Sequence, residues 1–253
     1  MKILLFPALL AAVTLALPSC SEECPASRQR INYLDLYIDY SDELNYKKFQ
    51  SAYEEDLKQM FRQMFRLEDC ACTGGRVKII SVGASGNLEV KTFAFRPLPA
   101  TPDKNRIPKD YLTFVQQVKA AMKKSAESAG EELSQTYFYE PLCREMNALV
   151  MDERAGKKMV VIYGDMLEHS DVLNMYKFNF VSGNAYSILS KGFACDLPDL
   201  SGVEIYNVNH RSADTEKRIR KAAHFWEKVF KERNVDKAIY RSSLHFEDQT
   251  SQK

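Results

Sequence analysis

The stretch that decides the fold is INYLDLYIDYSDE, residues 31–43. Its first nine residues are mostly apolar, which predicts a buried β-strand over residues 31–39. Apolar side chains then recur at helical spacing, so a long amphipathic helix is expected over residues 44–67. A second apolar run, MVVIYGD, occupies residues 159–165 and predicts another buried strand that ends in an acid. Two buried strands that both end in polar residues favour a sheet whose strand ends carry a functional site.

The rest of the chain alternates between strand and helix patterns. Residues 77–82 and 88–95 are joined by a short glycine-containing turn and predict an antiparallel hairpin. Further strands are expected over 203–208 and 237–241, and further helices over 111–129, 135–153 and 212–233. Residues 167–202 fit no pattern. The order predicts an α/β fold, a doubly wound and mostly parallel sheet with one antiparallel edge strand and helices on both faces.

Size and charge narrow the class of protein. The chain has 253 residues, of which 45% are apolar, enough for one large domain with a real core. Lysine and arginine number 35 and aspartate and glutamate 34, so we expect no nucleic-acid partner. A basic cluster at residues 217–221 is interpreted as the solvated face of a helix, in preference to a lipid- or nucleic-acid-binding patch.

The N-terminus is typical of an export signal. Lys2 is followed by an apolar run over residues 3–17, too short to span a bilayer, so residues 1–19 are predicted to be a signal peptide. The sequence Leu17-Pro18-Ser19-Cys20 resembles a bacterial lipobox and predicts a lipid anchor on Cys20. The alternative is ordinary cleavage with Cys20 in a disulfide. The acidic leader after Cys20 resembles export signals of some Bacteroidetes surface lipoproteins.

These features predict an order along the chain and a location. Residues 20–30 would be a tether, residues 31–241 the folded domain and residues 242–253 a polar, frayed tail. The protein would be exported and held by its lipid on the bacterial cell envelope, at the outer membrane. The remaining cysteines could form disulfides, with the connectivity open: Cys24, Cys70, Cys72, Cys143 and Cys195. A zinc site at Cys70-Ala71-Cys72 lacks a second pair of ligands and is disfavoured.

Polar residues follow both central strands at their carboxyl ends. Asp39 and Ser41 leave the first strand, and Asp165 leaves the strand at 159–163. In a doubly wound sheet these ends meet where the winding direction reverses, the usual place for a ligand. Oxygen donors gathered there favour a hard cation such as Mg²⁺.

These motifs resemble those of the von Willebrand factor A-type domain, a Rossmann-like fold that often carries a metal-ion-dependent adhesion site. The family's first motif is Asp-x-Ser-x-Ser, which Asp39 and Ser41 match, with Glu43 in place of the second Ser. Asp165 matches the third motif, with Gly164 where Ser or Thr is common. In the family a second loop supplies the hydroxyl of a Thr, for which Thr136 is the candidate here. The resemblance implies that Mg²⁺, with Ca²⁺ or Mn²⁺ as alternatives, is held by Asp39, Ser41, Glu43, Thr136 and Asp165.

Three functions remain open at this stage. The first is a membrane-anchored, cation-dependent adhesion or scaffold module that binds an unidentified protein partner. The second is a Mg²⁺-dependent phosphoester hydrolase that uses Asp39, and the third is a structural lipoprotein with a vestigial site in which Asp39, Ser41 and Asp165 only cap helices. No catalytic motif is present, so the first is preferred. His169 could line the crevice but is interpreted as a surface-loop residue, and the aromatic stretch 176–193 either forms a contact surface or packs on the core.

Overall fold

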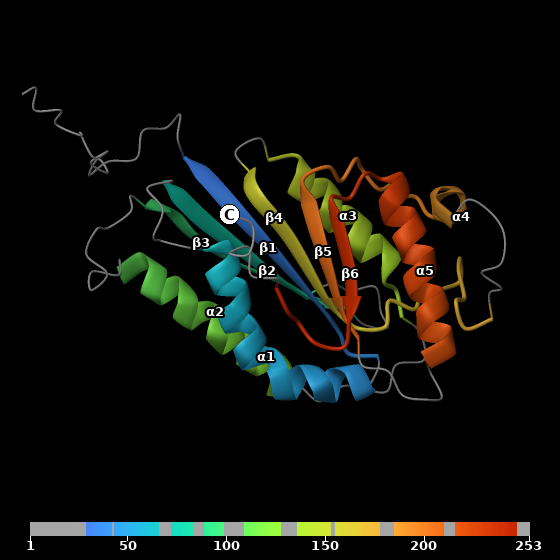
Figure 1. The fold of residues 1–253 in the computed structure, drawn as a ribbon, viewed down its shortest axis with the longest axis horizontal. Coiled ribbons are helices and arrows are strands. Elements are labelled where there is room, and N and C mark those ends of the chain that lie inside the picture. The colour runs from blue at the N-terminus through green and yellow to red at the C-terminus, as the bar shows by residue number, and fades with distance from the viewer. Residues whose placement is uncertain are drawn as a thin grey trace, which may run out of the picture.

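The computed structural model describes residues 29–41, 43–65, 72–82, 89–98, 109–127, 136–152, 155–177, 185–209 and 216–246. They form a six-stranded sheet with helices on both faces (Figure 1). The strands are β1 (Arg30–Asp39), β2 (Thr73–Val82), β3 (Glu89–Leu98), β4 (Ala155–Tyr163), β5 (Val203–Val208) and β6 (Lys237–Arg241). The helices are α1 (Glu43–Met64), α2 (Lys109–Glu127), α3 (Tyr139–Val150), α4 (Ala185–Gly192) and α5 (Glu216–Glu232).

The strand order is β3-β2-β1-β4-β5-β6. β1 pairs in parallel with both β2 and β4, the pairs β4–β5 and β5–β6 are also parallel, and only β3 runs antiparallel, at the edge. The predicted fold class, a mostly parallel α/β sheet with one antiparallel edge strand, is confirmed. The winding direction reverses between β1 and β4, so the switch point lies at their carboxyl ends.

The two faces of the sheet have separate cores because side chains alternate along each strand. Leu34, Leu36 and Ile38 of β1 pack in the core that α1 and α2 cover. Tyr33 and Tyr37 pack in the opposite core, together with α3, α4 and α5. Figure 1 shows α1 and α2 together on one side and α3 and α5 on the other. Asp35 and Asp39 share the α3 side of β1 with the two tyrosines.

Three details differ from the sequence-based expectation. Gly74 and Gly75 lie inside β2, and a Cβ at Gly75 would come within 2.2 Å of the Phe95 ring and 2.7 Å of the Phe65 ring. Close packing under the strand therefore requires glycine there. Helix α4 lies within the stretch that had no assignment. The prediction of a frayed tail is wrong for residues 242–246, since Leu244 is buried and Phe246 packs on Tyr206.

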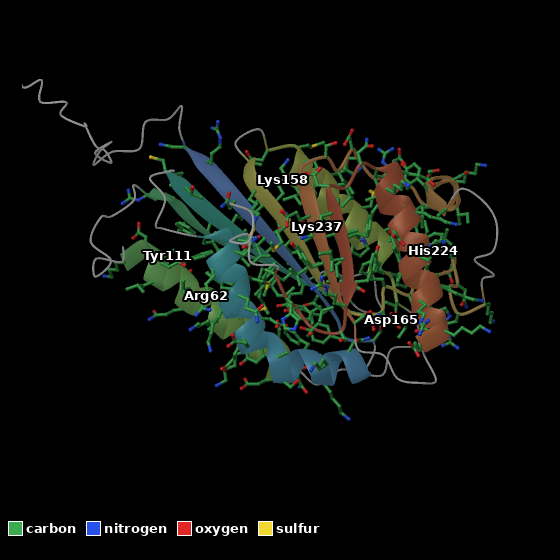
Figure 2. The ribbon with its side chains drawn as sticks, viewed as in Figure 1. Arg62, Tyr111, Lys158, Asp165, His224 and Lys237 are labelled. Carbon is green, nitrogen blue, oxygen red and sulfur yellow. A yellow bond between two sulfur atoms is a disulfide. The ribbon has the colours of Figure 1, made fainter. Side chains whose placement is uncertain are left out.

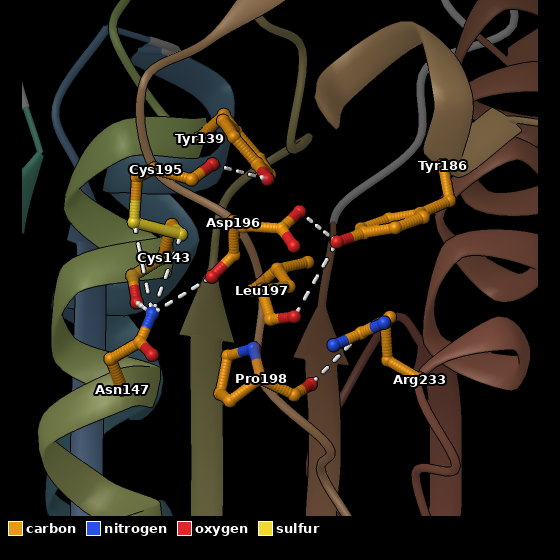
Figure 3. The surroundings of a disulfide bond; sticks show 9 residues. All are labelled: Tyr139, Cys143, Asn147, Tyr186, Cys195, Asp196, Leu197, Pro198 and Arg233. Atoms are coloured by element: carbon orange, nitrogen blue, oxygen red, sulfur yellow. Dashed lines mark hydrogen bonds between the residues drawn. A yellow bond between two sulfur atoms is a disulfide. The ribbon is translucent and has the colours of Figure 1, made fainter. Parts of the chain in front are cut away.

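A disulfide between Cys143 and Cys195 joins α3 to the segment that leads into β5 (Figure 3). The side-chain amide of Asn147 donates to the carbonyls of Cys143 (2.9 Å) and Asp196 (3.0 Å), which fixes the same junction. Cys72 is also disulfide-bonded, so the zinc alternative at Cys70-Ala71-Cys72 loses its second ligand. Cys20, Cys24 and Cys70 lie outside the described residues.

In the part of the chain that the structure describes, no helix is long and apolar enough to cross a bilayer. The predicted signal peptide at residues 1–19 lies outside that part, as do residues 20–28 of the tether and residues 247–253 of the tail. The export and anchoring of the chain therefore stay predictions.

Candidate functional site

The turn after β1 is closed by Asp39 and Ser41. The backbone N–H and the hydroxyl of Ser41 both donate to Asp39 Oδ1, at 2.9 Å and 2.6 Å. Asp39 is only 2% exposed, although it is the last residue of its strand. The backbone N–H of Tyr40 donates to the carbonyl of Val82 (3.3 Å), which ties the turn to the end of β2. The turn thus holds a buried carboxylate and a half-buried hydroxyl side by side.

Gly164 brings the end of β4 against this turn. A Cβ placed on Gly164 would lie 2.6 Å from Asp39 Cβ and 3.0 Å from Asp39 Oδ2. A side chain at residue 164 would displace Asp39, so this close contact requires the glycine. Asn207 of β5 holds Gly164 by donating to its carbonyl (2.8 Å). The ends of β1 and β4 are therefore in direct contact, as the sequence predicted.

Asp165 forms its own turn beside Asp39. The backbone N–H of Leu167 donates to Asp165 Oδ1 (2.9 Å), and the intervening Met166 has φ of 57°, in the left-handed region. Trp226 of α5 donates its indole N–H to the Met166 carbonyl (2.7 Å) and fastens this strained residue. Figure 2 shows Asp165 at the lower end of the sheet, beside the lower end of α5. No helix follows Asp165 among residues 166–177, so the helix-capping alternative for this residue is wrong.

Thr136 reaches the same end of the sheet through its backbone. Its N–H donates to the His169 carbonyl (3.1 Å), and the His169 N–H donates back to Thr136 (2.9 Å). The side chain of Thr136 is buried, with 4% exposed. The loop that was predicted to supply the hydroxyl thus lies beside the loop that begins at Asp165.

Glu168 is the residue that joins these two loops, and sequence reasoning missed it. Its Oε2 accepts the backbone N–H groups of Phe138 (2.7 Å) and Tyr139 (2.8 Å) at the start of α3. Burial raises the pKa of Glu168, which is fully buried. In the sequence, the only signal for Glu168 is its position three residues after Asp165, because the surrounding stretch shows no periodicity.

Asp35 is a second buried acid on the same face of β1, but it is not part of the site. It lies beside Lys78 in the β1–β2 register, four residues before Asp39. Burial raises the pKa of Asp35 to about 7, against the opposing attraction of Lys78 and Arg76. Neither of its carboxylate oxygens has a hydrogen-bond partner among the described residues. In the sequence, Asp35 alternates with the apolar residues of a predicted strand, and this pattern does not reveal a carboxylate without hydrogen-bond partners.

The donor set suits a hard divalent cation. Asp39, Ser41, Thr136 and Asp165 offer only oxygen atoms, the ligands that Mg²⁺ and Ca²⁺ prefer. Ser41 Oγ donates to Asp39 Oδ1 (2.6 Å), so the two oxygens are already held side by side. Within the described residues no three His, Cys, Asp or Glu side chains gather to hold a metal, so hydroxyls and water would complete the shell. Glu43 begins α1, and its side chain lies outside what the structure describes.

Comparison with known proteins gives only remote likenesses. No protein-family model matches the chain, and no curated protein matches it. The chain is similar to the human COPII-coat protein Sec24c, with 14% identity and a TM-score of 0.47 over 85% of this chain and 29% of that one. It is similar to proximal thread matrix protein 1 from the mussel byssus, solved with a zinc-occupied MIDAS motif, with 12% identity and a TM-score of 0.42 over 88% of this chain and 46% of that one.

A third similar structure is an aerotolerance-related membrane protein from Bacteroides fragilis. Its identity is 11% and its TM-score 0.40, over 83% of this chain and 90% of that one. This chain spans less than half of the other two proteins. The case for a site therefore rests on the residues of this chain.

Proposed function

We propose that this chain is an envelope-anchored binding module that holds a protein partner at the carboxyl ends of β1 and β4. A divalent cation would be held there by Asp39, Ser41, Thr136 and Asp165, with Glu43 as a further ligand. The observation that carries the proposal is the contact between the Asp39–Ser41 turn and Gly164, which places two acidic turns side by side at the switch point.

The buried state of the donors supports a binding role. Asp39, Thr136 and Asp165 are 2%, 4% and 7% exposed, and burying a carboxylate is costly unless hydrogen bonds or a bound cation compensate for it. A cation bound by so few carboxylates keeps positive charge and can accept an acidic group from a partner. The protein's residues would orient that cation through the Ser41 and Leu167 hydrogen bonds.

The disulfide supports the proposed location. Disulfides persist in exported proteins and are rare where the cytosol keeps thiols reduced. The bond between Cys143 and Cys195 therefore agrees with export. Anchoring through Cys20 would then hold the folded domain at a membrane surface by its lipid.

Calorimetric titration with Mg²⁺, Mn²⁺ and Ca²⁺ tests the metal site. We expect saturable binding of at least one cation to the wild-type chain. Asp39→Ala and Asp165→Ala should each weaken it by at least about 100-fold, because each removes one of the few carboxylates in the proposed ligand set.

Asp199→Ala is the matched control, because Asp199 closes an exposed turn with Ser201 that has the same local hydrogen bonds. It should leave cation affinity unchanged. Equal weakening by all three substitutions, or no saturable binding to the wild type, would contradict the proposal.

A further inference from the structure

A row of side chains in contact extends from the candidate site onto α5. The His169 ring lies 5.4 Å from the Tyr176 ring, and the Arg218 guanidinium lies 5.0 Å from the Tyr176 ring centre. His169 is itself paired through its backbone with Thr136. The three side chains of His169, Tyr176 and Arg218, which we call the Tyr176 ledge, are therefore continuous with the site.

The Tyr176 ledge is open to solvent and apolar in its middle. Tyr176 is 44% exposed, and Val172 in the same loop is 50% exposed. Asn174 fixes the loop by accepting the backbone N–H groups of Tyr176 (3.1 Å) and Lys177 (3.2 Å). The ledge is thus presented by a hydrogen-bonded turn.

The charge around the ledge is positive. Arg218 makes no ion pair within the described residues, and neither do Lys217 and Lys221 of the same helix. Arg220 differs, since it is paired with Glu216. The adjoining loop carries three acids, of which Asp165 and Glu168 are buried and Asp171 is exposed. An arginine that is stacked on an aromatic ring keeps its hydrogen-bonding edge available for a carboxylate.

We infer that the Tyr176 ledge is a docking surface for an acidic peptide segment of the protein partner. The inference rests on the proposed function, because the same segment would reach the cation with one carboxylate and Arg218 with another. Charge complementarity selects this occupant: cations that have no ion pair among the described residues, together with an exposed ring, favour a chain of carboxylates over a basic or neutral chain. The ledge would thereby determine which partners the site accepts.

The test uses the full chain and hexaglutamate that carries a neutral fluorophore. Anisotropy is measured with EDTA present and at about 0.01 M salt, where charges are weakly screened. The wild type should bind the peptide, and Arg218→Gln should weaken binding by about three- to fivefold, the effect of one exposed charge pair. Tyr176→Ala should weaken it as well, because the guanidinium loses its support.

Arg220→Gln is the matched control on the same helix, and hexaglutamine is the control peptide. Arg220→Gln should change affinity by less than about twofold. Equal losses for Arg218→Gln and Arg220→Gln, or no preference for hexaglutamate over hexaglutamine, would overturn the inference.

Because EDTA removes cations, this result is independent of the proposed metal site. If the wild type binds no cation but Arg218→Gln still weakens peptide binding, the docking surface is supported and the metal site is refuted. Cation binding without an Arg218 effect would refute the ledge alone.

Discussion

The turns at Asp39–Ser41 and Asp199–Ser201 have the same local chemistry in different surroundings. In each, the serine N–H and hydroxyl donate to Oδ1 of the aspartate, at 2.9 Å and 2.6 Å. Asp39 ends β1, is buried and faces Gly164. Asp199 precedes β5, is exposed, and accepts a hydrogen bond from Asn234 (3.1 Å) in the turn between α5 and β6.

The comparison separates the motif from the site. Asp-x-Ser closes a turn wherever it occurs, because the short side chain accepts from the backbone two residues on. What distinguishes Asp39 is the end of the strand on which it lies and the second acidic turn beside it. Asp199 has a structural partner instead and ties two loops together.

The largest expected effect concerns the segment that carries the Asp199 turn. Removing the disulfide with Cys143→Ala and Cys195→Ala should lower the free energy of unfolding by about 2–4 kcal/mol, because the bridge closes a long loop; the two cysteines are 52 residues apart. Urea denaturation measures this. Cation affinity should change by less than roughly twofold, as for independent sites. A parallel loss of cation affinity would show that the two regions are coupled.

Asp35 extends the comparison to a buried aspartate that has no serine to donate hydrogen bonds to its carboxylate. Its folded-state pKa of about 7 lies above the ordinary value of 3.8. The folded state therefore holds the proton more tightly, and stability falls as pH rises from about 4 to 7 and is then level. We expect Asp35 to make the wild type on the order of 2–3 kcal/mol less stable at pH 8 than at pH 5.

Asp35→Asn should remove most of that difference, because an amide does not ionise. Urea denaturation at pH 5 and pH 8 measures it for both chains. The same pH dependence in Asp35→Asn and in the wild type would assign the effect to another group.

The glycines beside the two turns give the next effect. Gly164→Ala should cost about 1–3 kcal/mol, because the added methyl overlaps Asp39, and it should also weaken cation binding. Gly202 follows the other turn, has φ of 81° and has open space around it. Gly202→Ala should cost about 1–2 kcal/mol for its backbone conformation alone and leave cation binding intact. Unchanged cation affinity in Gly164→Ala would mean that the contact with Asp39 is dispensable.

The smallest effect is expected at Asp199 itself. Hydrogen bonds from Ser201, and then from Asn234, lower the pKa of Asp199 below its usual value of 3.8. A depressed pKa adds stability above the ordinary value that is lost as pH falls through the folded-state pKa. Asp199→Asn should therefore be slightly less stable than the wild type at pH 7, with the gap closing in acid. A thermal melt at each pH is sufficient, and a gap that widens in acid would contradict this account.

Sequence reasoning predicted the fold and the ends of the strands because both follow from apolar periodicity. Asp39, Ser41 and Asp165 could be singled out since polar residues directly after buried strands converge at one edge of a parallel sheet. Glu168 could not, because its role depends on the start of α3, 30 residues away in sequence. The Tyr176 ledge likewise depends on a contact between a loop without periodicity and a distant helix.

The central claim is that tertiary placement, and not the Asp-x-Ser motif, makes the cation site. Mn²⁺ broadens the NMR signals of nuclei near it, so substoichiometric Mn²⁺ added to the labelled chain tests the claim directly. We predict that the amide signals of Tyr40, Ser41 and Gly164 broaden while those of Ser201 and Gly202 stay sharp. Equal broadening at both turns, or none at the first, would contradict the account.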